Sequence, residues 1–376
     1  MIPRHRAALL VLSLLAALAQ GCASSRASRA GAATPAVATP ERPAEIVFGP
    51  EEVQVTPLDL ALADKNDEEL FAIGTAAFGA ADYARAAAAF TRVVDRFPGS
   101  RHEAAALFDA GLAYEHLESW RLGLERFRDL ARRYTGPDAL EASFKVAECL
   151  YHLRELEDAH AALSAVAGHA DLSVGDRIRV LTLLGVVEAE QAKPEQAEAS
   201  LRKAVALWQG VGDRERLDPY FPAQAQYYLG ELYRDWFRAL PLDPSSGDEA
   251  KLQTDLEHKS EMLLSAQAHY LRAIRMGDHG WAVASGYRVG ELYEELRRQL
   301  LEAPLPPGLD EEHAQAYRAE LRGRVRILAT KAMSAYEASL TLASRTGVDG
   351  LTVLSDAQSA LVRLKQALAE EAGQGM

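Results

Sequence analysis

The residue types that most often carry catalysis or bind metals are present in this chain, but their spacing supports neither function. Ten histidines and two cysteines occur among 376 residues. From His102 to His313 the histidines are scattered without the spacing of paired metal ligands, and the sequence has no HExxH, GxSxG or GxxxxGK(S/T) motif. We therefore expect no enzyme, metal site or cofactor. A Ser-His-Asp hydrolase stays an open alternative, because such triads are recognised by geometry.

The two cysteines stand in different settings. Cys149 lies near Val146 in an amphipathic helical pattern, which indicates a small buried side chain. Cys22 instead follows a basic start at Arg4 and an apolar run that is too short to span a bilayer. Residues 1–21 therefore have the form of a secretory signal peptide. With one cysteine left in the folded region, no internal disulfide is expected.

The end of this segment, Leu18-Ala19-Gln20-Gly21-Cys22, resembles the bacterial lipoprotein signal, with Ala19 where Leu is usual. The resemblance implies that Cys22 is lipidated and that the protein is anchored in the cell envelope. No Asp follows Cys22, and by resemblance to lipoprotein sorting in Gram-negative bacteria this implies the outer membrane, facing the periplasm. We expect residues 22–66 to form a flexible Ala/Ser/Pro-rich tether, and about 40 such residues would reach roughly 35 Å. An ordinary signal peptide that contains Cys22 is the alternative.

The composition favours a folded, acidic domain. Hydrophobic residues make up 48% of the chain, and the formal net charge is −13, which loss of Arg4 and Arg6 with the signal would change to −15. This acidity disfavours nucleic acid, whose binding depends on Lys and Arg neutralising phosphates. It also disfavours broad adhesion to anionic lipid, so membrane contact is expected through the N-terminal lipid only. Basic protein partners are permitted.

The chain repeats one helical pattern about every 36 residues, and this repeat must position any functional surface. Each copy has a small residue in one amphipathic helix, as at Gly74, and then an Ala and a large residue in the next, as at Ala86 and Phe90. The small residue lets two helix axes approach closely, and the large residue fills the gap beside it. The six predicted packing residues are Gly74, Gly111, Ala147, Gly185, Gly230 and Gly290.

This pattern resembles the tetratricopeptide repeat (TPR) over roughly residues 67–343. The resemblance implies an all-α fold, an α-α superhelical solenoid of about six TPR-like hairpins in residues 67–345, with a capping helix and tail in residues 346–376. Copies five and six carry Pro-rich insertions near residues 236–262 and 296–328, where we expect lengthened helices with a bend. A plain helical bundle is the alternative.

An aromatic side chain stands three residues before the small residue in five of the six copies. In the TPR family the first helix of each pair lines the concave surface. The resemblance therefore implies a groove of aromatic rings beside acidic residues, which would attract Lys or Arg of a bound peptide or helix. Packing of the rings between neighbouring repeats is the alternative. The predicted groove residues are Phe71, Phe78, Phe108, Phe144, Tyr151, Tyr227, Tyr287, Glu148, Glu231 and Glu291.

These inferences predict a membrane-tethered, non-enzymatic scaffold that binds protein partners of the cell envelope through a concave TPR groove. In layout the chain resembles the TPR lipoproteins of the outer-membrane β-barrel assembly machine and of gliding-motility machinery. The late insertions depart from the barrel-assembly protein. The alternative is a cell-wall or solute-binding lipoprotein, because an aromatic row also suits stacking on sugar rings.

Overall fold

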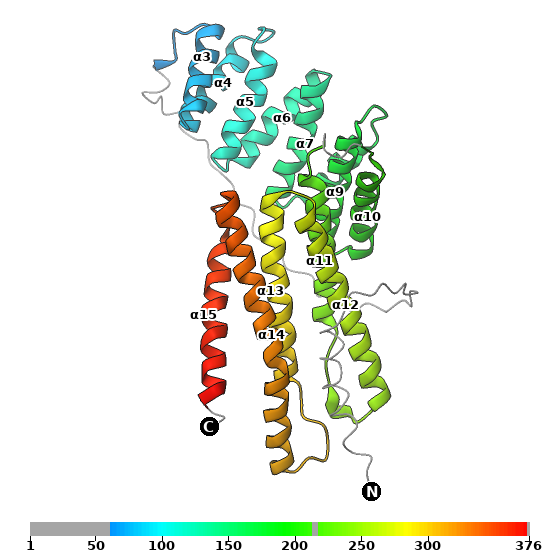
Figure 1. Ribbon diagram of the computed structural model, residues 1–376. Helices are drawn as coiled ribbons and strands as arrows, with labels where there is room; N and C mark the ends of the chain where they lie inside the picture. Colours follow the sequence, from blue (N-terminus) through cyan, green and yellow to red (C-terminus); the bar gives the residue numbers. More distant parts are fainter. Residues whose placement is uncertain (1–60, 213–216, 374–376) are drawn as a thin grey trace, which may run out of the picture. The chain divides into compact units, whose positions relative to one another are not determined.

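The computed structural model describes residues 61–212 and 217–373, and their regular structure is helical (Figure 1). The signal segment, Cys22 and most of the tether lie outside the described residues. The α-helices are α3 (Asp67–Gly79), α4 (Tyr83–Arg96), α5 (Glu103–His116), α6 (Trp120–Arg133), α7 (Pro137–His152), α8 (Leu156–Ala167), α9 (Val174–Glu190), α10 (Pro194–Gly210), α11 (Tyr220–Ala239), α12 (Glu249–Arg275), α13 (His279–Glu302), α14 (Glu311–Thr346) and α15 (Thr352–Gly373).

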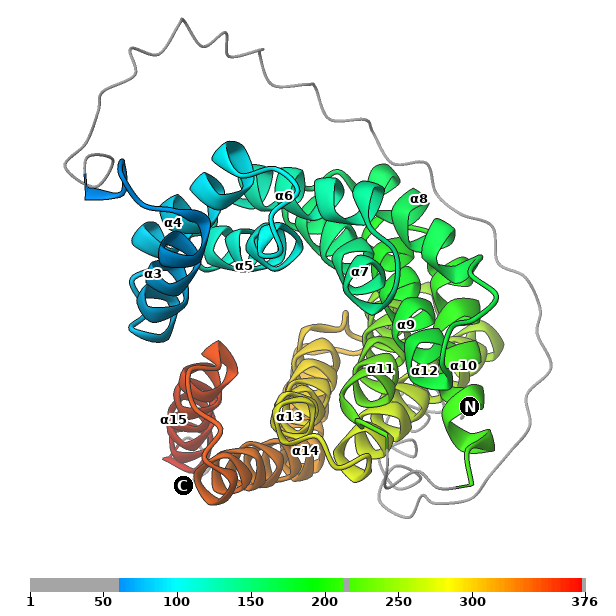
Figure 2. The ribbon, with the colours of Figure 1, turned by 90° about the horizontal axis from the view of Figure 1, so that it is seen from above.

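The chain divides into two compact units, and the boundary between Ala142 and Ser143 falls within α7. In the first unit, α3 to α6 pack in order, each helix against the next. In the second unit the helices from α8 to α15 do the same, and α11 also contacts α9 and α13. Figure 2 shows that α9, α11 and α13 form one layer of the second unit, with α10 and α12 behind them. The prediction of an all-α fold of consecutive helical hairpins is confirmed for the described residues.

Side-chain caps begin many of these helices where the sequence places Asn, Asp or Ser. Asn66 accepts a hydrogen bond from the backbone N–H of Glu69, and the Glu69 carboxylate accepts one from the N–H of Asn66. Asp82, Ser173 and Asp278 each accept the N–H three residues further on. A cap of this kind is worth about 1 kcal/mol of helix stability. Local sequence therefore determines where these helices start.

The same turn connects the two helices in each of the first four hairpins. One residue of the turn has a positive φ angle, and the N–H of the next residue donates to the carbonyl oxygen five residues before it. In the first hairpin this hydrogen bond runs from Asp82 to Ala77 over 2.9 Å. The residues with positive φ are Ala81 (59°), Glu118 (54°), Arg154 (61°) and Ala192 (57°).

The last two hairpins are longer, with helices of 20 and 27 residues and then of 24 and 36 residues. The Pro-rich insertions supply their turns, as the 3-10 turn Pro244–Ser246 does between α11 and α12. Lys259 of α12 closes the end of α11, because its Nζ donates to the carbonyl oxygens of Phe237 (2.9 Å) and Leu240 (2.6 Å). Burial lowers the pKa of Lys259 to about 8.

The helix α15 covers the end of the last hairpin. Its residues Ala357, Leu361 and Leu364 join the apolar cluster formed by α11 to α14, whereas Val362 is 66% exposed. A terminal helix of a repeat array needs one face that packs on the repeats and one face that is exposed to water. None of the helices in the described ranges has the length and apolar character needed to cross a membrane.

Candidate functional site

A large side chain of the second helix lies directly against the glycine of the first helix in five hairpins. A Cβ added to Gly74 would lie 2.6 Å from the ring of Phe90, closer than two such atoms can approach. In the third hairpin the corresponding Ala147 is buried. The small residues therefore pack two helices together, as their spacing predicts. The five pairs are Gly74–Phe90, Gly111–Phe127, Gly185–Leu201, Gly230–Tyr270 and Gly290–Tyr336.

In the two long hairpins the residue over the glycine is a tyrosine, and its hydroxyl group extends past the first helix. The Tyr336 hydroxyl donates to Glu294 over 2.8 Å, and the Tyr270 hydroxyl donates to Glu231. Burial, and then the neighbouring carboxylate, raise the pKa of both tyrosines well above its ordinary value. These tyrosines are therefore neutral donors that join the core of each hairpin to polar groups on α11 and α13.

The predicted aromatic row is part of this packing. A ring three residues before the glycine lies one helical turn away, so it meets the ring that covers the glycine. Phe144, Tyr227 and Tyr287 are buried and cannot offer their rings to a partner in this conformation. The structure thus places these three within the helical packing, which was the alternative reading. The ring pairs, with centroid distances, are Phe71–Phe90 (5.5 Å), Phe108–Phe127 (5.6 Å), Tyr227–Tyr270 (5.8 Å) and Tyr287–Tyr336 (5.5 Å).

Four of the predicted groove residues keep part of their surface exposed: Phe71, Phe78, Phe108 and Tyr151. The ring of Phe71 stacks on His102 at 4.6 Å. The hydroxyl of Tyr151 lies 3.4 Å from the Glu190 carboxylate of α9. Partner binding by these four residues stays a prediction.

The three predicted groove acids are paired with basic residues of the chain itself. Glu148 of α7 accepts from Lys145 (2.7 Å) and from Arg179 of α9 (3.3 Å). Glu231 and Glu291 pair in the same way with Arg234 and Arg288. These carboxylates are therefore not free charges awaiting Lys or Arg of a partner, which corrects the role expected for them.

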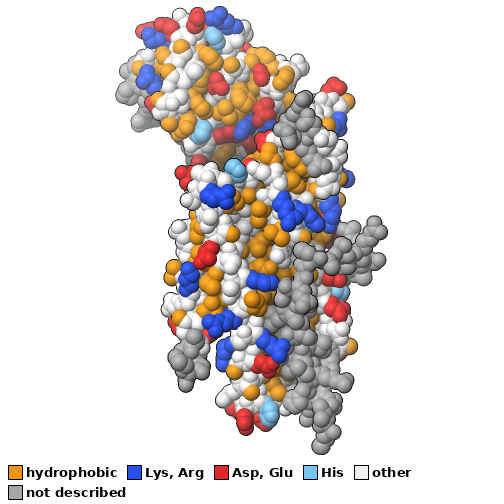
Figure 3. All heavy atoms as spheres, viewed as in Figure 1, with side chains coloured by type: hydrophobic (Ala, Val, Ile, Leu, Met, Phe, Trp, Pro, Cys, Tyr) orange, Lys and Arg blue, Asp and Glu red, His pale blue; other side chains and the backbone are white. Residues whose placement is uncertain are grey.

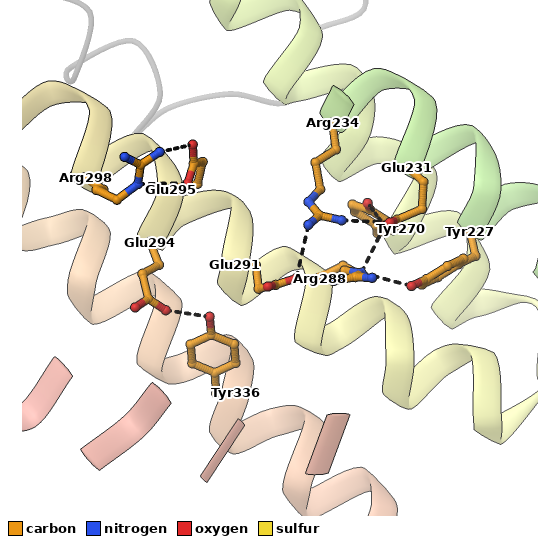
Figure 4. Close-up of polar contacts among 10 residues, drawn as sticks. All are labelled: Tyr227, Glu231, Arg234, Tyr270, Arg288, Glu291, Glu294, Glu295, Arg298 and Tyr336. Carbon is orange, nitrogen blue, oxygen red and sulfur yellow. Dashed lines mark hydrogen bonds and ion pairs between the residues drawn. The ribbon is translucent and has the colours of Figure 1, made fainter. Parts of the chain in front are cut away.

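Glu231, Arg234, Arg288 and Glu291 form a closed charge network between α11 and α13 (Figure 4). Arg234 lies 2.7 Å from Glu231 and 3.6 Å from Glu291. Arg288 lies 3.1 Å from Glu231, also contacts Glu291, and donates to the Tyr227 hydroxyl over 2.9 Å. Arg234 is only 7% exposed, and the other three side chains are 20–25% exposed, so the network is partly shielded from solvent.

The electrostatics of this network favour a fixed arrangement. Burial lowers the pKa of Arg288, but the Glu231 and Glu291 carboxylates more than offset this and hold that pKa above its ordinary value. Burial also lowers the pKa of Arg234, but the neighbouring carboxylates, Glu231 above all, more than offset this and raise that pKa. Two acids and two bases satisfy one another, and removal of one would leave a partly buried charge uncompensated. The network therefore holds α11 against α13.

Beside this network lies a group of aromatic residues that sequence reasoning missed. We call Tyr220, Phe221, Tyr228 and Trp281 the aromatic cluster; Tyr220 is 40% exposed and the other three are partly exposed. The Trp281 ring of α13 lies 5.8 Å from Tyr220 and 6.1 Å from Tyr228 of α11, measured between ring centroids. Three of the four residues are close in sequence, but only the packing of α13 on α11 brings Trp281 to them.

Polar groups elsewhere in the described ranges do not form a metal site. No cluster of three or more His, Cys, Asp or Glu side chains there is placed to hold an ion.

Cys149 is buried, in agreement with its pattern. His269 of α12 is also buried, with its Nδ1 2.7 Å from Gln226 and its ring stacked on Tyr233. Burial lowers the pKa of His269 to about 3, so the imidazole is neutral at physiological pH.

Comparison with known families assigns the first three hairpins, α3 to α8, to a repeat family. A tetratricopeptide repeat family model matches residues 71–120 and 117–171. This part of the chain consists of tetratricopeptide repeats. The later hairpins keep the same contact of a glycine with a large second-helix residue, in longer helices. Stacked TPR units present extended surfaces for binding other proteins.

Several solved structures share a general likeness with the chain. The apo form of RapI covers 81% of this chain and 99% of its own, with 9% identity and a TM-score of 0.45. A tetratricopeptide repeat protein from Parabacteroides merdae covers 80% and 98%, with 12% identity and a TM-score of 0.37. MamA covers 55% and 94%, with 14% identity and a TM-score of 0.37. At these values the likeness says nothing about function. No curated protein sequence matches the chain.

Proposed function

We propose that this protein is a membrane-tethered TPR scaffold that binds a protein partner through the layer formed by α9, α11 and α13. The aromatic cluster carries this proposal, because it exposes rings on helices that the charge network holds in place. Partly exposed Tyr and Trp give large, rigid contact area, and residues of this type dominate binding energy at protein interfaces. The rigid support lowers the ordering cost of binding.

The tether and its location complete the proposal. The sequence before the first repeat supports lipidation at Cys22 and attachment to the outer membrane, with the repeats in the periplasm. A complex for outer-membrane assembly or for motility would suit a tethered scaffold of this kind. Replacement of Cys22 by Ala should move the protein from the membrane fraction to the soluble fraction. Retention in the membrane fraction would contradict lipid anchoring but would leave the proposed binding surface untouched.

The binding surface is tested by copurification from detergent-solubilised envelopes. The double variant Tyr220→Ala/Trp281→Ala should recover the partner at least several-fold less well than the wild-type chain, because two anchoring rings are lost. The matched control is Leu207→Ala/Leu264→Ala, which removes two exposed apolar side chains from α10 and α12. Equal loss in both variants, or no stable partner for the wild-type chain, would contradict the proposal.

The same cluster supports one other candidate, a cell-wall or solute-binding lipoprotein, since Tyr and Trp rings also stack on sugars. Titration with muropeptides, followed by tryptophan and tyrosine fluorescence, separates the two. Saturable quenching that disappears in Trp281→Ala would favour the cell-wall ligand over a protein partner.

A further inference from the structure

The outer side of α14 carries an exposed stripe that no part of the described chain covers. Ala316, Ala319, Gly323, Ile327 and Thr330 follow one another at spacings of three and four residues, so they share one side of the helix. All five are exposed. Ile327 is 45% exposed, and nothing lies within 4 Å of the position where Gly323 would carry a Cβ. A surface of small side chains with one larger apolar residue is flat enough for another helix to approach closely.

A row of arginines borders this stripe. Arg318, Arg322 and Arg326 recur every four residues, which places them along adjacent positions of α14 over about 12 Å. All three are exposed, and their side chains have no hydrogen bond or ion pair with any other described residue. In contrast, the nearby Arg324 pairs with Glu320 at 2.6 Å. Figure 3 shows Lys and Arg side chains recurring along the part of the second unit formed by α11 to α15.

The remaining length of α14 already holds a helix on this side. Lys365 of α15 pairs with Glu337 of α14 at 3.3 Å, and Glu337 lies three helical turns after Arg326 on the same side. Since α15 runs back along α14, its end at Gly373 lies level with about residue 329 of α14. Figure 1 shows α14 continuing beyond α15 toward the α13–α14 turn. The stripe therefore begins where the internal helix stops.

We propose that this face of α14 binds an amphipathic helix of a partner protein that carries carboxylates along one edge. The apolar side of that helix lies on Ala319, Gly323 and Ile327, and its Glu or Asp side chains pair with the three arginines. The guanidinium group suits this role because its planar fork matches a carboxylate. The partner helix would continue the layer of α15 in line. The inference rests on the proposed protein-binding function but uses a different surface.

The test uses a synthetic helical peptide with Leu on one seam and Glu along the adjacent edge, and the mature chain carrying Cys22→Ala. Fluorescence anisotropy should show binding that weakens with added salt. The triple variant Arg318→Gln/Arg322→Gln/Arg326→Gln should weaken binding about tenfold, since each exposed pair contributes modestly. Gly323→Phe should abolish binding by blocking the approach, and it should leave the circular dichroism unchanged and should not lower the melting temperature, because the site is open.

Matched controls decide between this proposal and its competitors. The variant Arg128→Gln/Lys203→Gln/Arg275→Gln removes the same charge from exposed positions elsewhere and should bind the peptide like the wild-type chain. Equal weakening there, equal binding of a peptide with Gln in place of Glu, or no binding by the wild-type chain overturns the proposal. Binding of anionic vesicles instead of the peptide, or loss of a wild-type dimer in the arginine variant, would assign the face to lipid or to a second copy. Tyr220→Ala/Trp281→Ala should leave peptide binding intact, which separates this test from that of the aromatic cluster.

Discussion

The burial of His269 should be detectable in solution through the pH dependence of folding stability. Its pKa in the folded chain, about 3, lies below its ordinary value of 6.5. Between these two values the unfolded chain binds the extra proton, so folding stability falls as the pH is lowered through 6.5 and continues to fall toward 3. Above about pH 6.5 this residue adds no pH dependence.

We therefore expect His269→Gln to lose less stability on acidification than the wild-type chain. At about pH 4.5 the difference in the free energy of unfolding, relative to pH 7, should reach about 2–3 kcal/mol. Urea denaturation at the two pH values measures it. His258→Gln, an exposed change on the same helix, should follow the wild-type profile. Parallel profiles for all three proteins would show that the imidazole is not held neutral.

For single residues, the sequence predicts which side chains pack between helices better than it predicts which charged side chains pair with one another. The glycine spacing locates the close contacts, because a small residue opposite a large one has few other uses. The pairing of Glu231 and Glu291 with arginines of two helices was not predictable from the positions of these acids in the sequence. Arg234 and Arg288 stand three residues from those acids, a spacing that signals a pair within one helix. That the pairs would close into one network depends on how α11 lies against α13.

Each short hairpin turn contains a residue with a positive φ angle, which the composition of the turn does not reveal. A non-glycine residue in this left-handed conformation costs roughly 1–2 kcal/mol. Ala, Glu and Arg occupy the position here, and none of them favours it. The turn is therefore imposed by the two helices that it joins, and its geometry could not be read from the turn residues.

Replacement of such a residue by glycine should stabilise the protein. We expect Ala81→Gly and Ala192→Gly each to raise the free energy of unfolding by about 0.5–1 kcal/mol, after the larger entropy of the unfolded glycine chain is subtracted. Ala338→Gly, at an exposed position inside α14, is the control and should lower stability by about 1 kcal/mol. Thermal and urea unfolding report both. Destabilisation by all three substitutions would mean that the turns are not strained.

The helix boundaries themselves follow from the sequence to a large extent. Caps such as Asn66 and Asp82, and breaks such as Pro244, stand where helices begin or end. The lengthened helices α12 and α14 agree with the expectation drawn from the insertions, because the acidic residues after each Pro-rich turn start a helix that continues into the repeat without interruption.

On the scale of the whole molecule, stability should depend on the closing helix. Each repeat contacts its neighbours only, so an uncovered last hairpin would expose its apolar side. We expect Leu361→Glu to lower the free energy of unfolding by at least about 3 kcal/mol, because a charge would enter the apolar cluster. The adjacent Val362→Glu should change it by less than about 0.5 kcal/mol, since that side chain is 66% exposed. Similar effects of the two changes would contradict the capping role of α15.

The tyrosines that lie over Gly230 and Gly290 give the two long hairpins the same internal contact. Each first helix offers a Gly-Glu-Leu-Tyr segment, and each second helix offers a tyrosine that fits it. Both halves of this contact lie within one hairpin, Gly230 with Tyr270 between α11 and α12 and Gly290 with Tyr336 between α13 and α14. The contact is therefore copied whole whenever a hairpin is duplicated, and only the surface between neighbouring hairpins has to change.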